Sequence, residues 1–162
     1  MHRRQFIKIL PGILALAQRR PAPDFSLQDL AGNNVSSSMF RGKVVLLDFW
    51  ATWCEPCLAD IPILNMLKVK YENRGFEVVA VTLESGSADE IRRHAKLHGI
   101  NYTVLIGNDS IANKYNVIGF PIRYLITRDG RIHKKFTGSP AGKEKGAAAE
   151  IEREVQILVA AP

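Results

Sequence analysis

The sequence predicts an α/β domain built on a central mixed β-sheet that is flanked by helices. Strand-like apolar runs alternate with helix-like runs along most of the chain, and a hairpin signal followed by an amphipathic helix closes it. The chain has 162 residues, of which 46% are hydrophobic and 23% charged, which is enough for one core and too little for two. We therefore expect a single domain over residues 21–162.

Residues 1–20 are predicted to be an export signal rather than part of the fold. Arg3 and Arg4 open a basic stretch that resembles a twin-arginine signal, and a short apolar run follows from Ile9 to Ala17. Ala15-Leu16-Ala17 fits a small-residue cleavage site after Ala17. The run is far shorter than the ~20 residues of a membrane-spanning helix. We expect a periplasmic or otherwise extracytoplasmic protein, with an N-terminal arm on a cytoplasmic protein as the alternative.

The first half of the domain is expected to begin with a hairpin and a buried strand. After the stiff linker Pro21-Ala22-Pro23, segment 25–28 and the segment from Val35 onward flank Gly32-Asn33, which is a turn signal. Residues 44–50 are almost all apolar, which predicts a buried strand. The patterns that follow predict a helix at 54–71, a strand at 76–82, a helix at 88–98, a strand at 102–106 and a helical turn at 110–115.

The second half is expected to end in a hairpin and a helix. Strands 123–127 and 131–137 are joined by Asp129-Gly130, a two-residue turn signal. The last helix is predicted over 142–158. Its apolar face carries Ile151, Val155, Leu158 and Val159.

Charge and motif content exclude two classes of partner. The net charge is +6, but three of these charges fall in residues 1–17, which carry no acids, so the remainder has only +3. No basic stripe interleaved with aromatic residues is present, and we expect no nucleic-acid partner. The sequence contains no flavin or nicotinamide motif, so we expect no cofactor.

Two cysteines carry the functional prediction. Cys54 and Cys57 are the only cysteines, and they follow the strand at 44–50 where a helix is expected to begin. Unpaired backbone N–H groups and the positive end of the helix dipole stabilise a thiolate at that position. We expect Cys54 to attack a disulfide and Cys57, one turn further along, to resolve the mixed disulfide.

A zinc site is the alternative for the same cysteines. Together with His94 and His98 they have finger-like spacings at both ends. However, the 36 residues between Cys57 and His94 contain a whole predicted strand, where a compact finger has about 12 to 15 residues. We expect no metal site, and we expect the two histidines to be solvent-facing neighbours on a helix.

A family resemblance follows from these residues. Residues 48–57 with Pro62 are similar to the thioredoxin superfamily. Five further segments resemble the TlpA/ResA-like thiol-disulfide oxidoreductases, so that the resemblance covers about residues 22–159: Ala22-Pro23-Asp24-Phe25, 41–47, 117–121, 125–126 and 129–132. It implies a thioredoxin-like fold with an N-terminal β-hairpin and a central αβ insertion, and a place outside the cytoplasm.

Two acidic residues are candidates for the catalytic machinery. Asp48 lies in an otherwise apolar strand, where desolvation would raise its pKa toward the range of a proton shuttle that serves Cys57. Its position matches the buried acid of thioredoxins, whereas many TlpA-like proteins have Asn there; a solvated rim position is the alternative. Asp60 follows Cys57 by three residues on the same helix face. An acid at this offset in ResA-like proteins lines the active-site cavity and tunes the thiols, while the helix dipole alone is the simpler explanation.

Five residues are expected to bind substrate: Trp53, Glu55, Pro56, Phe120 and Pro121. Glu55 places a negative charge between the cysteines that opposes thiolate formation, and Pro56 fixes the first helical turn. The resemblance implies a cis bond before Pro121 and a loop that faces the cysteines, where the backbone pairs with an extended substrate. Trp53 and Phe120 would make an apolar lip, or else pack as ordinary core residues. The residue after Pro121 is not the Glu of the cytochrome-maturation branch, so an apocytochrome substrate is not supported.

These residues predict a thiol-disulfide oxidoreductase that acts outside the cytoplasm, as a reductant, on disulfide-bonded proteins. Its electrons would come from a partner thiol protein, which we expect to be membrane-bound, and the enzyme itself is expected to be a monomer. A peroxiredoxin-like peroxidase is one alternative, although Ala51 stands where such enzymes have Thr or Ser three residues before the reactive cysteine. A non-catalytic peptide-binding module on the same fold is the other.

Overall fold

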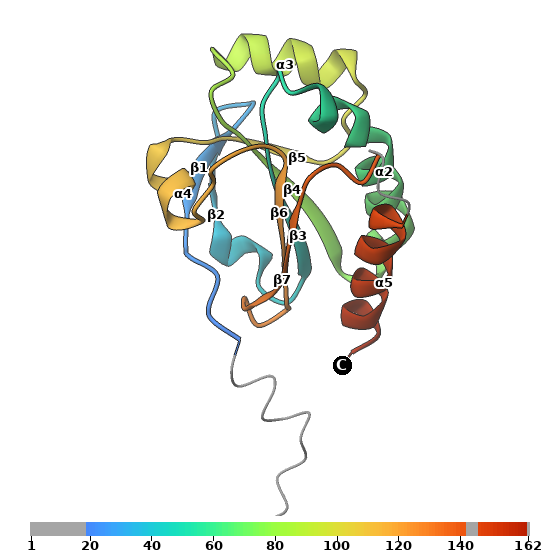
Figure 1. Ribbon diagram of the computed structural model, residues 1–162. Coiled ribbons are helices and arrows are strands. Elements are labelled where there is room, and N and C mark those ends of the chain that lie inside the picture. The colour runs from blue at the N-terminus through green and yellow to red at the C-terminus, as the bar shows by residue number, and fades with distance from the viewer. Residues whose placement is uncertain (1–18, 142–145, 162) are drawn as a thin grey trace, which may run out of the picture.

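The structure is a computed structural model that describes residues 19–141 and 146–161. Seven strands form one mixed sheet in the order β2-β1-β5-β4-β3-β6-β7, with helices on both of its faces (Figure 1). The strands are β1 (Ser26–Asp29), β2 (Asn34–Ser36), β3 (Val44–Trp50), β4 (Phe76–Thr82), β5 (Thr103–Ile106), β6 (Ile122–Ile126) and β7 (Ile132–Thr137). The α-helices of the described residues are α2 (Glu55–Tyr71), α3 (Ala88–Leu97), α4 (Asp109–Lys114) and α5 (Ala147–Ala160), with short 3-10 helices at Ser37–Phe40 and Glu72–Arg74.

Strand β3 is the centre of the sheet and leads to the cysteines. It pairs in parallel with β4 and antiparallel with β6, and all seven of its residues are buried. Side chains alternate along a strand, so Leu46, Asp48 and Trp50 face one side of the sheet while Leu47 and Phe49 face the other. A strand buried on both faces needs apolar residues on both, which explains the nearly continuous apolar run.

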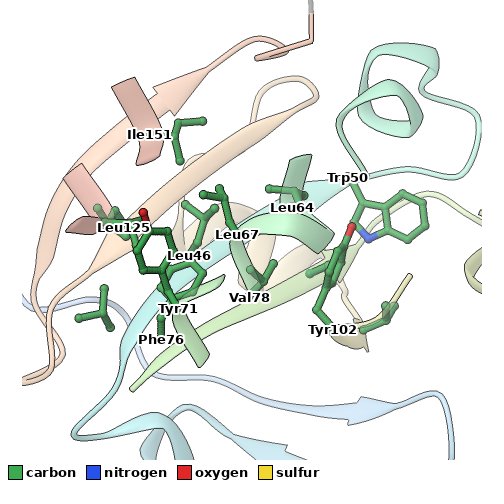
Figure 2. Close-up of a cluster of buried hydrophobic side chains, with 14 of the residues drawn as sticks. Leu46, Trp50, Leu64, Leu67, Tyr71, Phe76, Val78, Tyr102, Leu125 and Ile151 are labelled. Carbon is green, nitrogen blue, oxygen red and sulfur yellow. The ribbon is translucent and has the colours of Figure 1, made fainter. Parts of the chain in front are cut away.

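The two faces of the sheet carry separate cores. On the face of Leu46 and Trp50, α2, α3 and α5 cover a cluster that also contains both cysteines. Figure 2 shows part of it, with Leu64 and Leu67 of α2 packed against the strands and Ile151 of α5 close by. On the opposite face, α4 and the N-terminal segment cover a second cluster around Phe49. The helix that carries the cysteine pair is therefore anchored along its length in the larger core.

Most predicted elements are present close to their expected positions. Strands 44–50 and 76–82 have the expected bounds, and the N-terminal hairpin forms around Gly32-Asn33. Helix α3 and strand β5 supply the expected central αβ insertion. The 3-10 helix at Ser37–Phe40 was not predicted; the side chain of Ser36 caps it by accepting a hydrogen bond from the backbone of Ser38.

The start of the last helix was predicted too early. Helix α5 begins at Ala147 rather than at residue 142, because Gly146 precedes it with a φ of 109°, a left-handed conformation that a helix interior does not contain. Residues 142–145 and the expected export signal, apart from Arg19 and Arg20, lie outside the described residues. Within the described ranges, no helix combines the length and apolar character needed to cross a bilayer.

Candidate active site

Cys54 and Cys57 form a disulfide at the junction of β3 and α2. Cys54 is the N-cap of the helix, with extended backbone angles, and its Sγ accepts a hydrogen bond of 3.3 Å from the backbone N–H of Cys57. The helix therefore starts at Glu55, one residue later than predicted. A sulfur that caps a helix in this way lies at the positive end of the dipole and beside an N–H donor, which are the two features that stabilise a thiolate.

The two sulfurs differ in what they face. Cys54 lines a groove of about 720 Å³ on the surface, whereas Cys57 does not line it. The residue-level exposures are low for both, 5% for Cys54 and 3% for Cys57, so access to the disulfide is through this groove. The groove is formed by the loops after β3, β4 and β5 and by the loop before β6, with these lining residues: Trp53, Cys54, Glu55, Pro56, Leu83, Glu84, Gly107, Asn108, Asp109, Ala112, Val117, Ile118, Gly119 and Phe120.

The residues predicted to bind substrate are gathered around the cysteine pair. The peptide bond between Phe120 and Pro121 is cis, as the resemblance implies. The rings of Trp53 and Phe120 meet edge to face with centroids 5.7 Å apart, and Trp53 Nε1 donates a 2.8 Å hydrogen bond to the carbonyl of Glu84. Glu55, Pro56 and Phe120 line both the first groove and a second one of about 580 Å³, to which Pro121 also contributes.

Asp48 is buried on the side of the sheet that α2 covers. Its exposure is 3%, so the alternative of a solvated rim position is wrong. Burial raises the pKa of the Asp48 carboxyl, the negative charge of Asp60 adds to the rise, and the Arg123 guanidinium opposes it. Nε of Arg123 lies 2.8 Å from Oδ1 of Asp48, as an ion pair rather than an aligned hydrogen bond. The predicted direction of the pKa change is therefore confirmed.

Asp60 is not on the wall of either groove. It is fully buried, and its carboxylate accepts hydrogen bonds from Arg123 Nη2 at 2.7 Å, from the backbone N–H of Ala141 at 2.9 Å and from the hydroxyl of Ser139. Ser139 and Ala141 do line the second groove, so Asp60 lies directly behind its wall. The simple explanation from the helix dipole misses this buried network.

Arg123 is the site residue that sequence reasoning missed. It is fully buried in β6, directly opposite Asp48 in the antiparallel register, and it contacts both Asp48 and Asp60. A signal was present: Arg123 interrupts an otherwise apolar strand, just as Asp48 does. Two opposite charges in two apolar strands could have suggested a cross-strand pair.

The histidines considered as zinc ligands lie apart from this network. His94 and His98 stack on each other on α3 and at its C-terminal cap, with ring centroids 6.1 Å apart. The two cysteines are bonded to one another, which removes the thiolates that a zinc site would need. Among the described residues, no cluster of three His, Cys, Asp or Glu side chains has a metal-binding arrangement.

Comparison with known proteins agrees with this geometry. The Redoxin family model matches residues 17–151. The chain belongs to the Redoxin family. Thiol-disulfide oxidoreductase ResA of Geobacillus kaustophilus (strain HTA426) is 36% identical over 145 residues, which are 89% of this chain and 79% of the relative. Thioredoxin-like protein YneN of Bacillus subtilis (strain 168) is 35% identical over 141 residues, or 86% of this chain and 82% of the relative.

The solved structures show the same relationship. A putative thiol:disulfide interchange protein DsbE from Chlorobium tepidum superimposes with a TM-score of 0.79 at 30% identity, covering 87% of this chain and 96% of that one. The thioredoxin-like fold and the resemblance to the TlpA/ResA-like family are thereby confirmed. This Redoxin family member is an oxidoreductase of the thiol-disulfide type.

Proposed function

We propose that the protein is an extracytoplasmic protein-disulfide reductase that exchanges two electrons through its Cys-Glu-Pro-Cys sequence. The observation that carries the proposal is the position of Cys54: its sulfur caps a helix and lines the groove, while Cys57 is bonded to it from behind. The apolar pair Trp53 and Phe120 beside the cis peptide bond offers an extended substrate a surface next to the reactive sulfur.

In the reduced enzyme, the reaction would proceed in two exchanges. The Cys54 thiolate attacks a substrate disulfide; a bond from Cys54 Sγ to one substrate sulfur forms, and the other substrate sulfur leaves as a thiolate that takes a proton from water. Cys57 then gives its proton to the Asp48 carboxylate, and its thiolate attacks Cys54 Sγ. The enzyme disulfide forms, and the second substrate thiolate leaves and is protonated. Two electrons pass from the enzyme dithiol to the substrate disulfide.

We assign the proton transfer in this scheme to Asp48. It faces the same side of the sheet as α2, and Arg123 connects it to Asp60, which lies three residues after Cys57 on the same helix face. A raised pKa brings a carboxyl closer to neutrality, where a general base is most effective. A thiol protein would return the enzyme to the dithiol form.

The redox direction is tested by the midpoint potential of the Cys54/Cys57 couple. We expect a value of about −270 mV, as for thioredoxin, measured by equilibration with glutathione or dithiothreitol buffers. A potential of about −120 mV, as for the oxidant DsbA, would show that the protein oxidises its substrates rather than reduces them.

The compartment is tested separately through the N-terminal segment. The paired Arg3 and Arg4 support export by a twin-arginine route. Replacing both with Lys should leave the protein in the cytoplasm, which fractionation of expressing cells would detect. Unchanged export of this variant would refute the twin-arginine assignment.

A further inference from the structure

One guanidinium connects both buried acids of the site. Arg123 is fully buried, and three of its nitrogen atoms have three different partners. Nε lies 2.8 Å from Asp48 in β3, Nη2 lies 2.7 Å from Asp60 in α2, and Nη1 donates to the carbonyl of Gly138 at 3.2 Å. The three partners belong to three separate parts of the chain.

The two carboxylates are not equivalent in this arrangement. Asp60 accepts hydrogen bonds from three donors, in Arg123, Ser139 and Ala141. Oδ1 of Asp48 has only the ion pair with Arg123 and no aligned hydrogen bond among the described residues. Three donors therefore hold the Asp60 carboxylate in place, whereas Asp48 has an oxygen without an aligned donor in the described part of the chain and is the acid to which we assign the proton exchange.

The charge balance makes Arg123 necessary for that exchange. With both acids ionised, the network holds two negative charges and one positive charge in a region without solvent, which is costly unless the charges are paired. A guanidinium stays charged at any physiological pH, so the only proton that can enter or leave is one on a carboxyl group. Without Arg123, an ionised Asp48 would face an ionised Asp60 with no cation between them.

We propose that Arg123 is a positioning residue that favours the ionised form of the Asp48 carboxyl, the form that can take the Cys57 proton, by sharing its guanidinium between Asp48 and Asp60. This rests on the disulfide-exchange function proposed above. Two other titratable residues, Cys57 on α2 and Tyr102 ahead of β5, belong to the buried cluster on the sheet face that Asp48 shares. Burial and the nearby Asp48 raise the pKa of Tyr102, so its hydroxyl stays neutral and does not compete for the proton.

The direct test is the titration of the Asp48 carboxyl itself. Carbon-13 NMR of the full chain, labelled at aspartate Cγ and assigned with Asp48→Asn, follows this group without reference to activity. In Arg123→Met the Asp48 titration should move to higher pH by about one to three pH units, the effect of removing an opposite charge at this distance. Arg123→Lys should move it less and in the same direction, because an ammonium group does not reach both acids with separate donors.

The rate of disulfide exchange against pH supplies the second measurement. A carboxyl group must be ionised to act as a base. In the Arg123 variants the acidic limb of the rate profile should therefore shift to higher pH together with the Asp48 titration, and activity should recover at higher pH. In an Asp48→Asn background, Arg123→Lys should have no further effect on the rate. Arg128→Lys is the matched control, because Arg128 is also an arginine near the end of β6 but donates only to backbone carbonyls.

Each part of the inference can fail on its own. If Arg123→Met does not fold, Arg123→Lys decides the question. An unmoved Asp48 titration in a folded Arg123 variant, or a fall in rate that is equal at every pH, would overturn the role of Arg123. A wild-type protein that exchanges no disulfide would refute the proposed function instead, and the titration would still test the pairing.

Discussion

Carboxylates lie on both sides of the disulfide, and the two sets have opposite environments. Behind it, Asp48 and Asp60 are buried and share Arg123. In front of it, the exposed side chains of Glu55, Glu84 and Asp109 line the groove, and no Lys or Arg from the part of the chain that the structure describes is among its lining residues. Charges in the interior interact strongly, while water and salt screen those at the surface. We propose that the rear set controls proton transfer and that the front set influences which substrate approaches.

The largest effect should come from replacing each of the two cysteines in turn. Cys57→Ser should remove essentially all turnover and accumulate a mixed disulfide between Cys54 and the substrate, because nothing remains to resolve it. Cys54→Ser should also be inactive but should accumulate far less of the adduct, since Cys57 does not line the groove. Mass spectrometry under non-reducing conditions distinguishes the two outcomes. Equal trapping by both variants would contradict the assignment of front and rear sulfurs.

The next largest effect should come from the rear set. Asp48→Asn keeps the shape of the side chain but removes the base, so the exchange rate near neutral pH should fall roughly 10- to 100-fold with the fold retained. The measurement is the rate of reduction of a disulfide-bonded protein between pH 5 and pH 9, alongside circular dichroism. An unchanged rate at every pH would remove Asp48 from the mechanism.

Asp48→Asn should lower the exchange rate but raise the free energy of unfolding. The folded-state pKa of Asp48 is raised above its ordinary value of 3.8, so folding favours the protonated form more than the unfolded chain does, and the folded state loses stability as the pH rises from about 4 through the raised pKa. Asp48→Asn removes this loss, and each pH unit of the raised pKa corresponds to about 1.4 kcal/mol. Chemical denaturation of the oxidised protein at pH 4 and pH 8 should show the variant gaining only at the higher pH. A loss at pH 8 would show that the pair with Arg123 outweighs desolvation.

The smallest effect should come from the front set. Glu55→Gln removes a screened surface charge next to Cys54, so exchange with an uncharged small disulfide should speed up by about twofold or less and lose this gain in high salt. Replacing Glu55, Glu84 and Asp109 together should weaken the reaction with a lysine-containing disulfide peptide, by a few-fold in KM and little in kcat. Peptides with lysine and with glutamate beside the cysteine make the comparison. Equal KM values for both peptides in the wild type would show that the front charges do not select substrate.

The sequence allowed prediction of those parts of the fold that carry a local signal. The strand at 44–50 is a continuous apolar run, and the turn at Gly32-Asn33 has its own residue chemistry, so both were located correctly. The start of α5 was missed, because the amphipathic pattern continues toward Gly146 while the backbone of that glycine stops the helix.

The residues of the candidate site also fall into those that a local sequence signal predicts and those that it does not. The cysteine pair and the burial of Asp48 could be predicted because neighbouring residues in the chain define them. The partner of Asp48 could not, since Arg123 is distant in sequence and meets it only through the register of β3 and β6. The donors to Asp60 were missed for a related reason: Ser139 and Ala141 follow β7, and nothing near Asp60 in the chain indicates them.

The short segment after β7 has a further consequence. Gly138 donates its backbone N–H to the carbonyl of Pro121 at 3.1 Å, while Ser139 and Ala141 hold Asp60 and also face outward into the second groove. A polypeptide that moves these two residues on docking must also disturb the donors of Asp60. By thermodynamic reciprocity, proton uptake behind the cysteines then changes the docking affinity by the same factor as docking changes proton uptake. A change in pH would then alter how tightly a polypeptide docks in the second groove, and docking would alter the pH at which the buried network takes up a proton.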